Sequence, residues 1–285
     1  MLTLIFFRYY GQKGERKHLA ELVFVGLGLY DEKDLSLRAL DETKTADNVF
    51  AEFYTSLMPA LDLKQLEILI GKKVTFVSRR TLEDEEGRQI LRAAEQGKVV
   101  FLVPGDPMIA TTHVDLKIRA RRMGINTRIV HNASIISAVM GITGLQNYKF
   151  GRGVTIPFPE ESVTAETPYR VILENKKRAL HTLCFLDVKA EKKLYMTVKE
   201  GLKALLTVEE MKKEDVVAFD TLTVGVARAG APDSCVRAGH VKDLLSYDFG
   251  LPPHILIFPG KLHFMEAEAL VTFANAPKEI LETAK

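Results

Sequence analysis

The sequence predicts a two-domain α/β protein, and three observations support this prediction. The chain has 285 residues, which at about 150 residues per domain is enough for two domains. From Leu22 to about Phe150, short apolar runs alternate with segments whose apolar residues recur three and four positions apart, as strands alternate with helices. After about Gly151 the alternation becomes irregular, which predicts a second domain with a mixed sheet.

The first domain, expected at residues 22–150, is predicted to be an open parallel sheet with helices on both faces. Its strands are expected at 22–26, 48–53, 73–77, 98–103 and 127–131, and its helices at 37–45, 63–70, 83–96 and 110–122. Gly71, Gly97 and Gly124 follow three of these helices, where a left-handed C-cap residue belongs. Each helix returns the chain in the direction of the preceding strand, so the strands pair in parallel. The runs 22–25 and 99–103 are apolar throughout, as parallel strands buried on both faces must be.

The second domain, expected at residues 151–285, is predicted to be a mixed α/β domain. Its strands are expected at 153–158, 182–188, 221–229 and 254–258. Thr197 with Glu200, and Thr207 with Glu210, have the spacing of capping boxes that begin two short helices. Apolar residues between positions 262 and 273 have the spacing of a terminal amphipathic helix.

Residues 1–21 do not continue this pattern and are expected to form a flexible extension. The apolar run at 2–7 is shorter than the roughly 7–15 residues of a signal-peptide core, and no basic residue precedes it. The run at 11–17 is polar and contains two glycines.

Composition excludes several classes of function. The 39 Lys and Arg residues are balanced by 37 Asp and Glu residues, so a nucleic-acid partner is not expected. Cys184 and Cys235 are far apart in sequence and the histidines lack ligand spacing, so neither a disulfide framework nor a metal site is expected. No apolar run approaches the roughly 20 residues that span a bilayer. We expect a cytoplasmic protein that acts away from membranes.

A glycine-rich turn, GLGLYD at residues 26–31, follows the first strand at the edge where open parallel sheets bind ligands. Such a turn lets a ligand approach the backbone and leaves amide groups free to bind it. Asp31 replaces the third glycine of a dinucleotide fingerprint, whereas Glu52 lies about 20 residues on, where that fingerprint places an acid. A plain tight turn, a dehydrogenase and a methyltransferase all remain compatible with this segment.

Two further segments follow strands of the same sheet. PGDP at residues 104–107 closes the most apolar strand, and its two prolines fix the direction of the Asp106 carboxylate. Ser134 follows the fifth strand at a helix start, where capping and ligand binding are compatible roles. There is no nucleophile elbow and no cysteine triad, so no catalytic residue is assigned.

These segments, taken together in their order, resemble the diphthine synthase family, which belongs to the tetrapyrrole-methylase-like class of S-adenosylmethionine-dependent methyltransferases. The resemblance is carried by GLGLYD at 26–31, FAEFYTSL at 50–57, PGDP at 104–107, ATTH at 110–113, ITGL at 142–145, YKFG at 148–151, FLDVKAEK at 185–192, ARAG at 227–230, PPHILI at 252–257 and PGKLH at 259–263. It spans nearly everything from Leu22 to the C-terminus. The first 20 residues lie outside it, and Asn132-Ala133 replaces an expected Ala-Pro.

The resemblance implies a homodimer in which two α/β domains enclose S-adenosyl-L-methionine in the cleft between them. The implied cofactor contacts are Leu29, Asp106, Ile109, Ser134 and Ile135 from the first domain, and Leu186, Ala229 and His254 from the second. The implied substrate is a histidine of translation elongation factor 2 that carries a 3-amino-3-carboxypropyl group. Trimethylation of its amino group, with S-adenosyl-L-homocysteine as the other product, is a step of diphthamide biosynthesis.

Three alternatives remain at this point. A corrin or precorrin methyltransferase shares the implied fold and cofactor but differs in substrate. The hypothesis of a nicotinamide-dependent oxidoreductase depends on the glycine turn, and Asp31 in place of the third glycine argues against it. A non-catalytic scaffold would bind neither cofactor.

Overall fold

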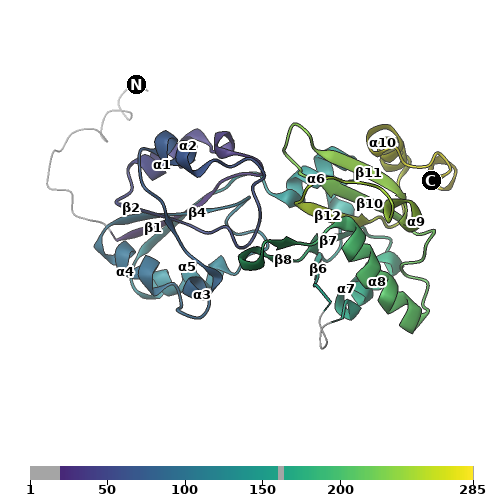
Figure 1. Cartoon of the computed structure of the whole chain (residues 1–285), viewed down its shortest axis with the longest axis horizontal. Helices are drawn as coiled ribbons and strands as arrows, with labels where there is room; N and C mark the ends of the chain where they lie inside the picture. The colour runs from purple at the N-terminus through teal and green to yellow at the C-terminus, as the bar shows by residue number, and fades with distance from the viewer. Residues whose placement is uncertain (1–19, 160–163, 285) are drawn as a thin grey trace, which may run out of the picture.

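The computed structural model describes residues 20–159 and 164–284, and the chain forms two lobes that lie side by side (Figure 1). Each lobe is built on one five-stranded sheet with helices on both faces. The predicted α/β class, with one parallel and one mixed sheet, is confirmed. Residues 1–19 of the expected extension lie outside the described residues, and Glu21 already belongs to the first strand.

The sheet of the first lobe consists of parallel strands in the order β3-β2-β4-β1-β5. These strands are β1 (Glu21–Gly26), β2 (Asn48–Ala51), β3 (Thr75–Phe76), β4 (Lys98–Val103) and β5 (Asn126–Val130). In the central pair, Gly26 at the end of β1 lies opposite Val103 at the end of β4. The loops that follow β1, β4 and β5 therefore leave the sheet at the same edge.

Helices cover both faces of this sheet (Figure 1). One face carries α1 (Leu37–Lys44) and α2 (Leu63–Ile70), and the other carries α3 (Arg79–Leu82), α4 (Arg88–Gln96) and α5 (His113–Arg122). The alternation along β1 explains both layers, because Leu22 and Phe24 enter one hydrophobic cluster while Val23 and Val25 enter the other.

The sheet of the second lobe is mixed, with the order β11-β10-β12-β7-β6. Its strands are β6 (Val154–Ile156), β7 (Thr182–Leu186), β10 (Leu222–Ala227), β11 (Cys235–His240) and β12 (His254–Phe258). Only β6 and β7 pair in parallel, and the other neighbours are antiparallel.

Helices also cover both faces of the second sheet. One face carries α6 (Ile135–Thr143) and α10 (Phe264–Ala274), and the other carries α7 (Glu166–Lys177) and α8 (Val198–Lys212), while α9 (Val241–Leu244) and α11 (Ile280–Thr283) are short. In α6, Val139 shares a hydrophobic cluster with Ile257 of β12 and Leu270 of α10. Residues 135–150 therefore pack with the second lobe, and we propose a domain boundary at residues 131–134 instead of the expected position near Phe150.

A two-stranded hairpin connects the lobes. It consists of β8 (Val188–Lys189), the 3₁₀ turn η3 (Ala190–Lys192) and β9 (Leu194–Tyr195), which leave the second lobe directly after β7. At its tip, Ala190 packs against the hydrophobic cluster of the first lobe. Figure 1 shows β8 between the two sheets.

Two local predictions in the first lobe need correction. The helix expected at 83–96 begins only at Arg88, because Glu86 and Gly87 adopt φ angles of 59° and 64°, and the short helix α3 ends before that range. Gly97 is not a left-handed cap, since its φ of 174° is extended backbone. Gly71 and Gly124 do have the expected positive φ angles, 67° and 78°.

In the second lobe, the capping box at Thr197 and Glu200 begins α8 as predicted. The second box is wrong, because Thr207 and Glu210 lie within the same continuous helix and the Thr207 hydroxyl donates to the Lys203 carbonyl. The helix α7 and the edge strand β11 were not predicted.

Candidate active site

The glycine turn after β1 and the PGDP loop after β4 meet at the carboxyl edge of the first sheet. Gly105 N donates to Gly28 O at 2.7 Å, and Gly28 N donates to Gly105 O at 3.3 Å. Gly28 has a φ of +87°, and a Cβ there would lie 2.3 Å from the Cβ of Asp34. Glycine is required at this position both for the backbone conformation and for the close approach.

The amide groups of the glycine turn are not free, which corrects one expectation from the sequence. Asp34 Oδ2 accepts hydrogen bonds from Leu29 N at 2.8 Å and Tyr30 N at 2.7 Å. The turn is therefore closed by a carboxylate of its own chain, and what it offers a ligand is the side chain of Leu29 and a close approach at Gly28.

The Asp106 carboxylate is buried and held by three donors. Its Oδ1 accepts from Met108 N at 3.0 Å, and its Oδ2 accepts from His131 Nδ1 at 2.7 Å and Asn132 N at 3.3 Å. The direction of this carboxylate is fixed by these contacts as well as by the neighbouring prolines. Asp106 therefore joins the loop after β4 to the loop after β5.

Asn132, the departure from the expected Ala-Pro, has a structural reason. Its Nδ2 donates to Gly26 O and to Asp34 O, each at 2.9 Å. An alanine at this position could not make these contacts, so in this chain an amide side chain ties the loop after β5 to the loop after β1. Ser134 follows as the N-cap of α6, and its backbone N donates to Ser137 Oγ at 3.3 Å.

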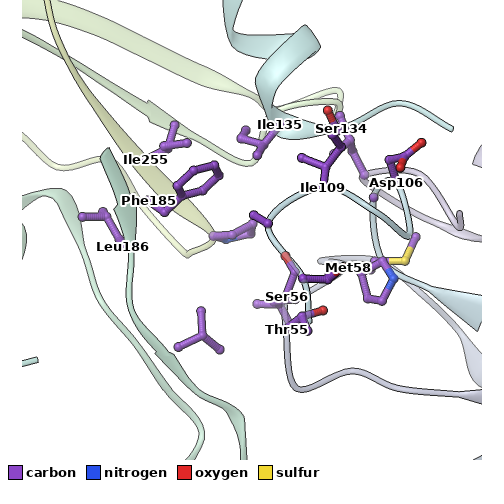
Figure 2. A pocket seen from close by; sticks show the side chains of 18 of the residues that line it. Thr55, Ser56, Met58, Asp106, Ile109, Ser134, Ile135, Phe185, Leu186 and Ile255 are labelled. Carbon is purple, nitrogen blue, oxygen red and sulfur yellow. The ribbon is translucent and has the colours of Figure 1, made fainter. Parts of the chain in front are cut away.

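These loops form one side of a cleft whose other side belongs to the second lobe (Figure 2). The cavity volume is about 290 Å³, near the lower end of the range typical of small-molecule sites. All eight residues expected to contact a cofactor line this one cleft: Leu29, Asp106, Ile109, Ser134, Ile135, Leu186, Ala229 and His254. Their lining of the cleft is a matter of geometry, and their binding of a cofactor remains a prediction.

The second lobe supplies a mainly apolar wall. In Figure 2, Ile135, Phe185, Leu186 and Ile255 line one region of the cleft, while Thr55, Ser56 and Met58 lie in another. The two lobes approach each other closely at Leu29, because a Cβ on Gly230 would lie 2.8 Å from the Leu29 Cβ.

His254 lies in this wall with both ring nitrogens engaged. Its Nδ1 accepts from Val198 N at 3.3 Å, and its Nε2 donates to Leu251 O at 3.1 Å. Burial lowers the pKa of His254, so the ring is neutral near pH 7 and is held in one tautomer. Arg228 fixes the same loop, since its Nη1 donates to Phe249 O at 2.8 Å and to Leu251 O at 2.5 Å.

Glu52 does not serve as the ribose acid of a dinucleotide site. Its carboxylate is fully buried and does not line the cleft. It accepts instead from Tyr54 N at 2.9 Å, Thr55 N at 3.0 Å and Thr55 Oγ1 at 2.5 Å. The nicotinamide alternative therefore loses the acid on which it depended.

Residues 20–159 and 164–284 contain neither a cluster of metal-ligating side chains nor a membrane-spanning helix. No cluster of three or more His, Cys, Asp or Glu side chains there has the arrangement of a metal site. No helix in that part of the chain is both long and apolar enough to cross a bilayer.

Comparison with known proteins identifies the class. Residues 21–245 match the family described as Tetrapyrrole (Corrin/Porphyrin) Methylases. Because the match covers most of the chain, the chain belongs to the tetrapyrrole methylase family.

Individual relatives narrow this class. The diphthine synthase of Methanocella arvoryzae is 53% identical over 254 residues, which are 89% of this chain and 98% of the relative. That of Methanosarcina mazei is 50% identical over 266 residues, covering 92% of this chain and 98% of the relative. A crystal structure of diphthine synthase superposes with a TM-score of 0.82 at 41% identity, covering 92% of this chain and 99% of the other. Within the tetrapyrrole methylases, the chain thus groups with the diphthine synthases.

Proposed function

We propose that this chain methylates the amino group of a 3-amino-3-carboxypropyl-modified histidine of translation elongation factor 2, with S-adenosyl-L-methionine as donor, in diphthamide biosynthesis. The observation that carries this proposal is the gathering of eight positions, spread from Leu29 to His254, around one cleft between the lobes. Its relatives named diphthine synthase support the same substrate.

The chemistry of the cleft fits the cofactor. An adenine, a ribose and an amino-acid end need an apolar slot with a few fixed polar groups. Leu29, Ile109, Ile135 and Leu186 supply apolar side chains, and the buried residues Asp106 and Ser134 supply fixed polar groups. When bound, S-adenosylmethionine supplies a methyl group activated by its positive sulfur.

The protein's own contribution is placement and charge. The loops after β1, β4 and β5 are cross-linked through Asp34, Asp106 and Asn132, so this side of the cleft is rigid before a ligand arrives. Because His254 is neutral, the second lobe adds no imidazolium charge beside a cationic sulfur. A rigid cleft that aligns amine and methyl group removes much of the entropic barrier of the displacement.

The direct test incubates the enzyme with methyl-labelled cofactor and elongation factor 2 isolated with the 3-amino-3-carboxypropyl modification. We expect label on the elongation factor, read by mass spectrometry of the modified peptide. Label appearing only in a small tetrapyrrole would assign the chain to corrin or precorrin methylation. Calorimetry with S-adenosylhomocysteine separates the remaining alternatives, since absence of heat would leave a scaffold or a nicotinamide enzyme. We further propose that the enzyme is a cytoplasmic homodimer, and sedimentation tests the dimer.

Asp106→Ala tests the cofactor side of the cleft. Removing the carboxylate leaves Met108 N, Asn132 N and His131 without their acceptor, so cofactor affinity should fall by about 1–3 kcal/mol, measured by calorimetry. Asp115→Ala is the matched control, because Asp115 is an exposed residue of α5 in the same lobe. Unchanged affinity in Asp106→Ala would remove Asp106 from the binding site.

A further inference from the structure

One stretch of the cleft wall is left unassigned by the eight cofactor positions. The loop after β2 contributes Tyr54, Thr55, Ser56, Leu57 and Met58 to the lining. Figure 2 shows Thr55, Ser56 and Met58 grouped together, apart from Phe185 and Leu186 of the second lobe. A substrate amine that meets a methyl group inside this cleft needs a part of the wall that the cofactor does not occupy.

Within this loop, the Thr55 hydroxyl donates a hydrogen bond to a buried carboxylate, that of Glu52. Thr55 Oγ1 donates to Glu52 Oε1 at 2.5 Å, and Glu52 is fully buried. The other carboxylate oxygen, Oε2, accepts from Tyr54 N and Thr55 N. Since the hydroxyl proton is given to Glu52, the lone pairs of the Thr55 oxygen remain to accept an N–H from a group in the cleft.

Behind Glu52 lies a second buried group, His113 at the start of α5. His113 Nδ1 lies 3.1 Å from Pro107 O, and because a carbonyl can only accept, Nδ1 carries the proton. Burial lowers the pKa of His113 to about 4, so the ring is neutral and its Nε2 holds a lone pair. This buried Nε2 has no hydrogen-bond partner among the described residues and lies 3.8 Å from Glu52 Oε1.

Two buried acceptors therefore face each other, an arrangement that one added proton would satisfy. A protonated Glu52 could donate to His113 Nε2 and would end the unpaired state of that nitrogen. Among the described residues, the titratable or charged groups facing Glu52 are His113 from α5, Arg79 from α3 and Tyr54 from its own loop. Burial raises the pKa of Glu52, and the hydrogen bonds from Thr55 and Tyr54 together with the Arg79 charge only partly oppose this.

We propose that Thr55, Glu52 and His113 form a relay that accepts the proton which the substrate ammonium must lose before each methyl transfer. This inference rests on the proposed function and deepens it by assigning the acceptor. The ammonium N–H proton passes to Thr55 Oγ1 while the Thr55 hydroxyl proton passes to Glu52 Oε1, which then faces His113 Nε2 as a carboxylic acid.

The freed nitrogen lone pair forms the new N–C bond, and the broken C–S bond leaves its electron pair on sulfur. The proton returns through Thr55 to water in the cleft before the next transfer. Thr55 is the catalytic residue of this relay, because it alone touches the substrate, while Glu52 and His113 act through it.

The test compares Glu52→Gln and Thr55→Val with the wild-type enzyme in labelled methyl transfer to modified elongation factor 2, at saturating cofactor, across pH. At pH 7 both variants should be slower by about a hundredfold, the lower end of general-base effects. Their rates should rise about tenfold per pH unit until the substrate amine loses its proton in solution, near its own pKa of about 8. Cofactor affinity should stay unchanged, and Thr55→Ser should restore the wild-type profile because it keeps the hydroxyl.

Glu266→Gln is the matched control, since Glu266 is also a fully buried glutamate that faces a histidine but lies away from the cleft. It should retain the wild-type shape of the pH profile. If Glu52→Gln and Thr55→Val keep the wild-type profile, or lose the same fraction of activity at every pH, the relay is overturned while the methyltransferase assignment stands. Absence of transfer by the wild-type enzyme would overturn the proposed function together with the relay.

Discussion

Each lobe contains a fully buried glutamate that faces a histidine, and the two pairs are completed differently. In the second lobe, Glu266 Oε1 accepts from His181 Nε2 at 2.9 Å, and Glu266 also accepts from Lys149 Nζ and from two backbone amides. In the first lobe, Glu52 lies 3.8 Å from His113, and its hydrogen-bond donors among residues 20–159 and 164–284 belong to its own loop.

The difference appears in the pKa of the two carboxyl groups. Burial alone would raise the pKa of both groups. At Glu266 the hydrogen bonds from His181, His263 N, Lys149 and Gln146 N outweigh burial and lower the pKa to about 2. At Glu52 burial prevails, and the pKa is raised. The same two residue types thus make a permanently charged structural link in one lobe and a group ready to gain a proton in the other.

The Glu266 cluster also explains two motifs that never reach the cleft. Glu266 binds the backbone before η2 (Asn147–Lys149) and the N-terminus of α10, and His181 Nδ1 accepts from Gly260 N at 2.9 Å. The segments YKFG at 148–151 and PGKLH at 259–263 are therefore joined by one buried carboxylate. Their place in the family pattern is explained by the packing of the second lobe.

The largest effect is expected from Glu266→Gln. Loss of this charge leaves Lys149 and His181 without their partner, which should cost about 3 kcal/mol of unfolding free energy at pH 7. Because the folded pKa lies near 2, below the ordinary glutamate value of 4.5, this stabilisation is present above pH 4.5 and is lost as pH falls toward 2. Urea unfolding from pH 2 to pH 7 measures it, and a variant as stable as wild type at pH 7 would refute the structural link.

Lys149→Met should have an intermediate effect. It removes one charged donor from Glu266 while keeping the apolar stem, at a cost of about 2 kcal/mol. With that donor gone, the pKa of Glu266 should rise, so acid unfolding should begin at higher pH. Lys64→Met, at an exposed position on α2, provides the control for loss of a positive charge. Equal acid unfolding of the two variants would show that Lys149 does not act through Glu266.

Glu52→Gln should change the free energy of unfolding least, and it should stabilise the protein, whereas the two substitutions above destabilise it. A raised folded pKa means that the stability contributed by Glu52 is complete below its unfolded pKa and is lost as pH rises through the folded value. The uncharged variant escapes this loss, so it should exceed wild type by about 1 kcal/mol at pH 8 and approach it at pH 4. Thermal unfolding of the variant and the wild type at both pH values measures this difference. A variant less stable than wild type at pH 8 would show that the Glu52 charge stabilises the fold, as the Glu266 charge does.

The sequence predicted best those elements whose signal is local. The strand β4 was predicted with its observed bounds because residues 99–103 are all apolar, and α2 because its apolar residues recur three and four positions apart and Gly71 follows it. The strand β11 was missed because it is an edge strand whose residues are half exposed, so no apolar run marks it.

In the candidate site, what sequence reasoning missed depends on long-range contacts. Asn132 binds the carbonyl of Gly26, 106 residues earlier, and no pattern in the chain predicts that pairing. Glu52 has the spacing of a ribose acid, yet the loop that follows β2 turns its carboxylate inward. The unpaired nitrogen of His113 becomes visible only in the fold, where the start of α5 lies beside Glu52, the residue that follows β2.

The hairpin β8–β9 has a consequence for how ligands enter and leave. At the boundary that we propose, residues 131–134 join the lobes covalently, and the hairpin adds a second attachment where Ala190 packs on the first lobe. A rotation of one lobe about the line through these two attachments leaves both in place, whereas any other wide separation of the lobes would have to pull Ala190 away from the hydrophobic cluster of the first lobe. We therefore expect the exchange of S-adenosylhomocysteine for new S-adenosylmethionine between transfers to depend on small displacements of the loops after β1, β4 and β5. This exchange should be slowest where those loops are most tightly cross-linked.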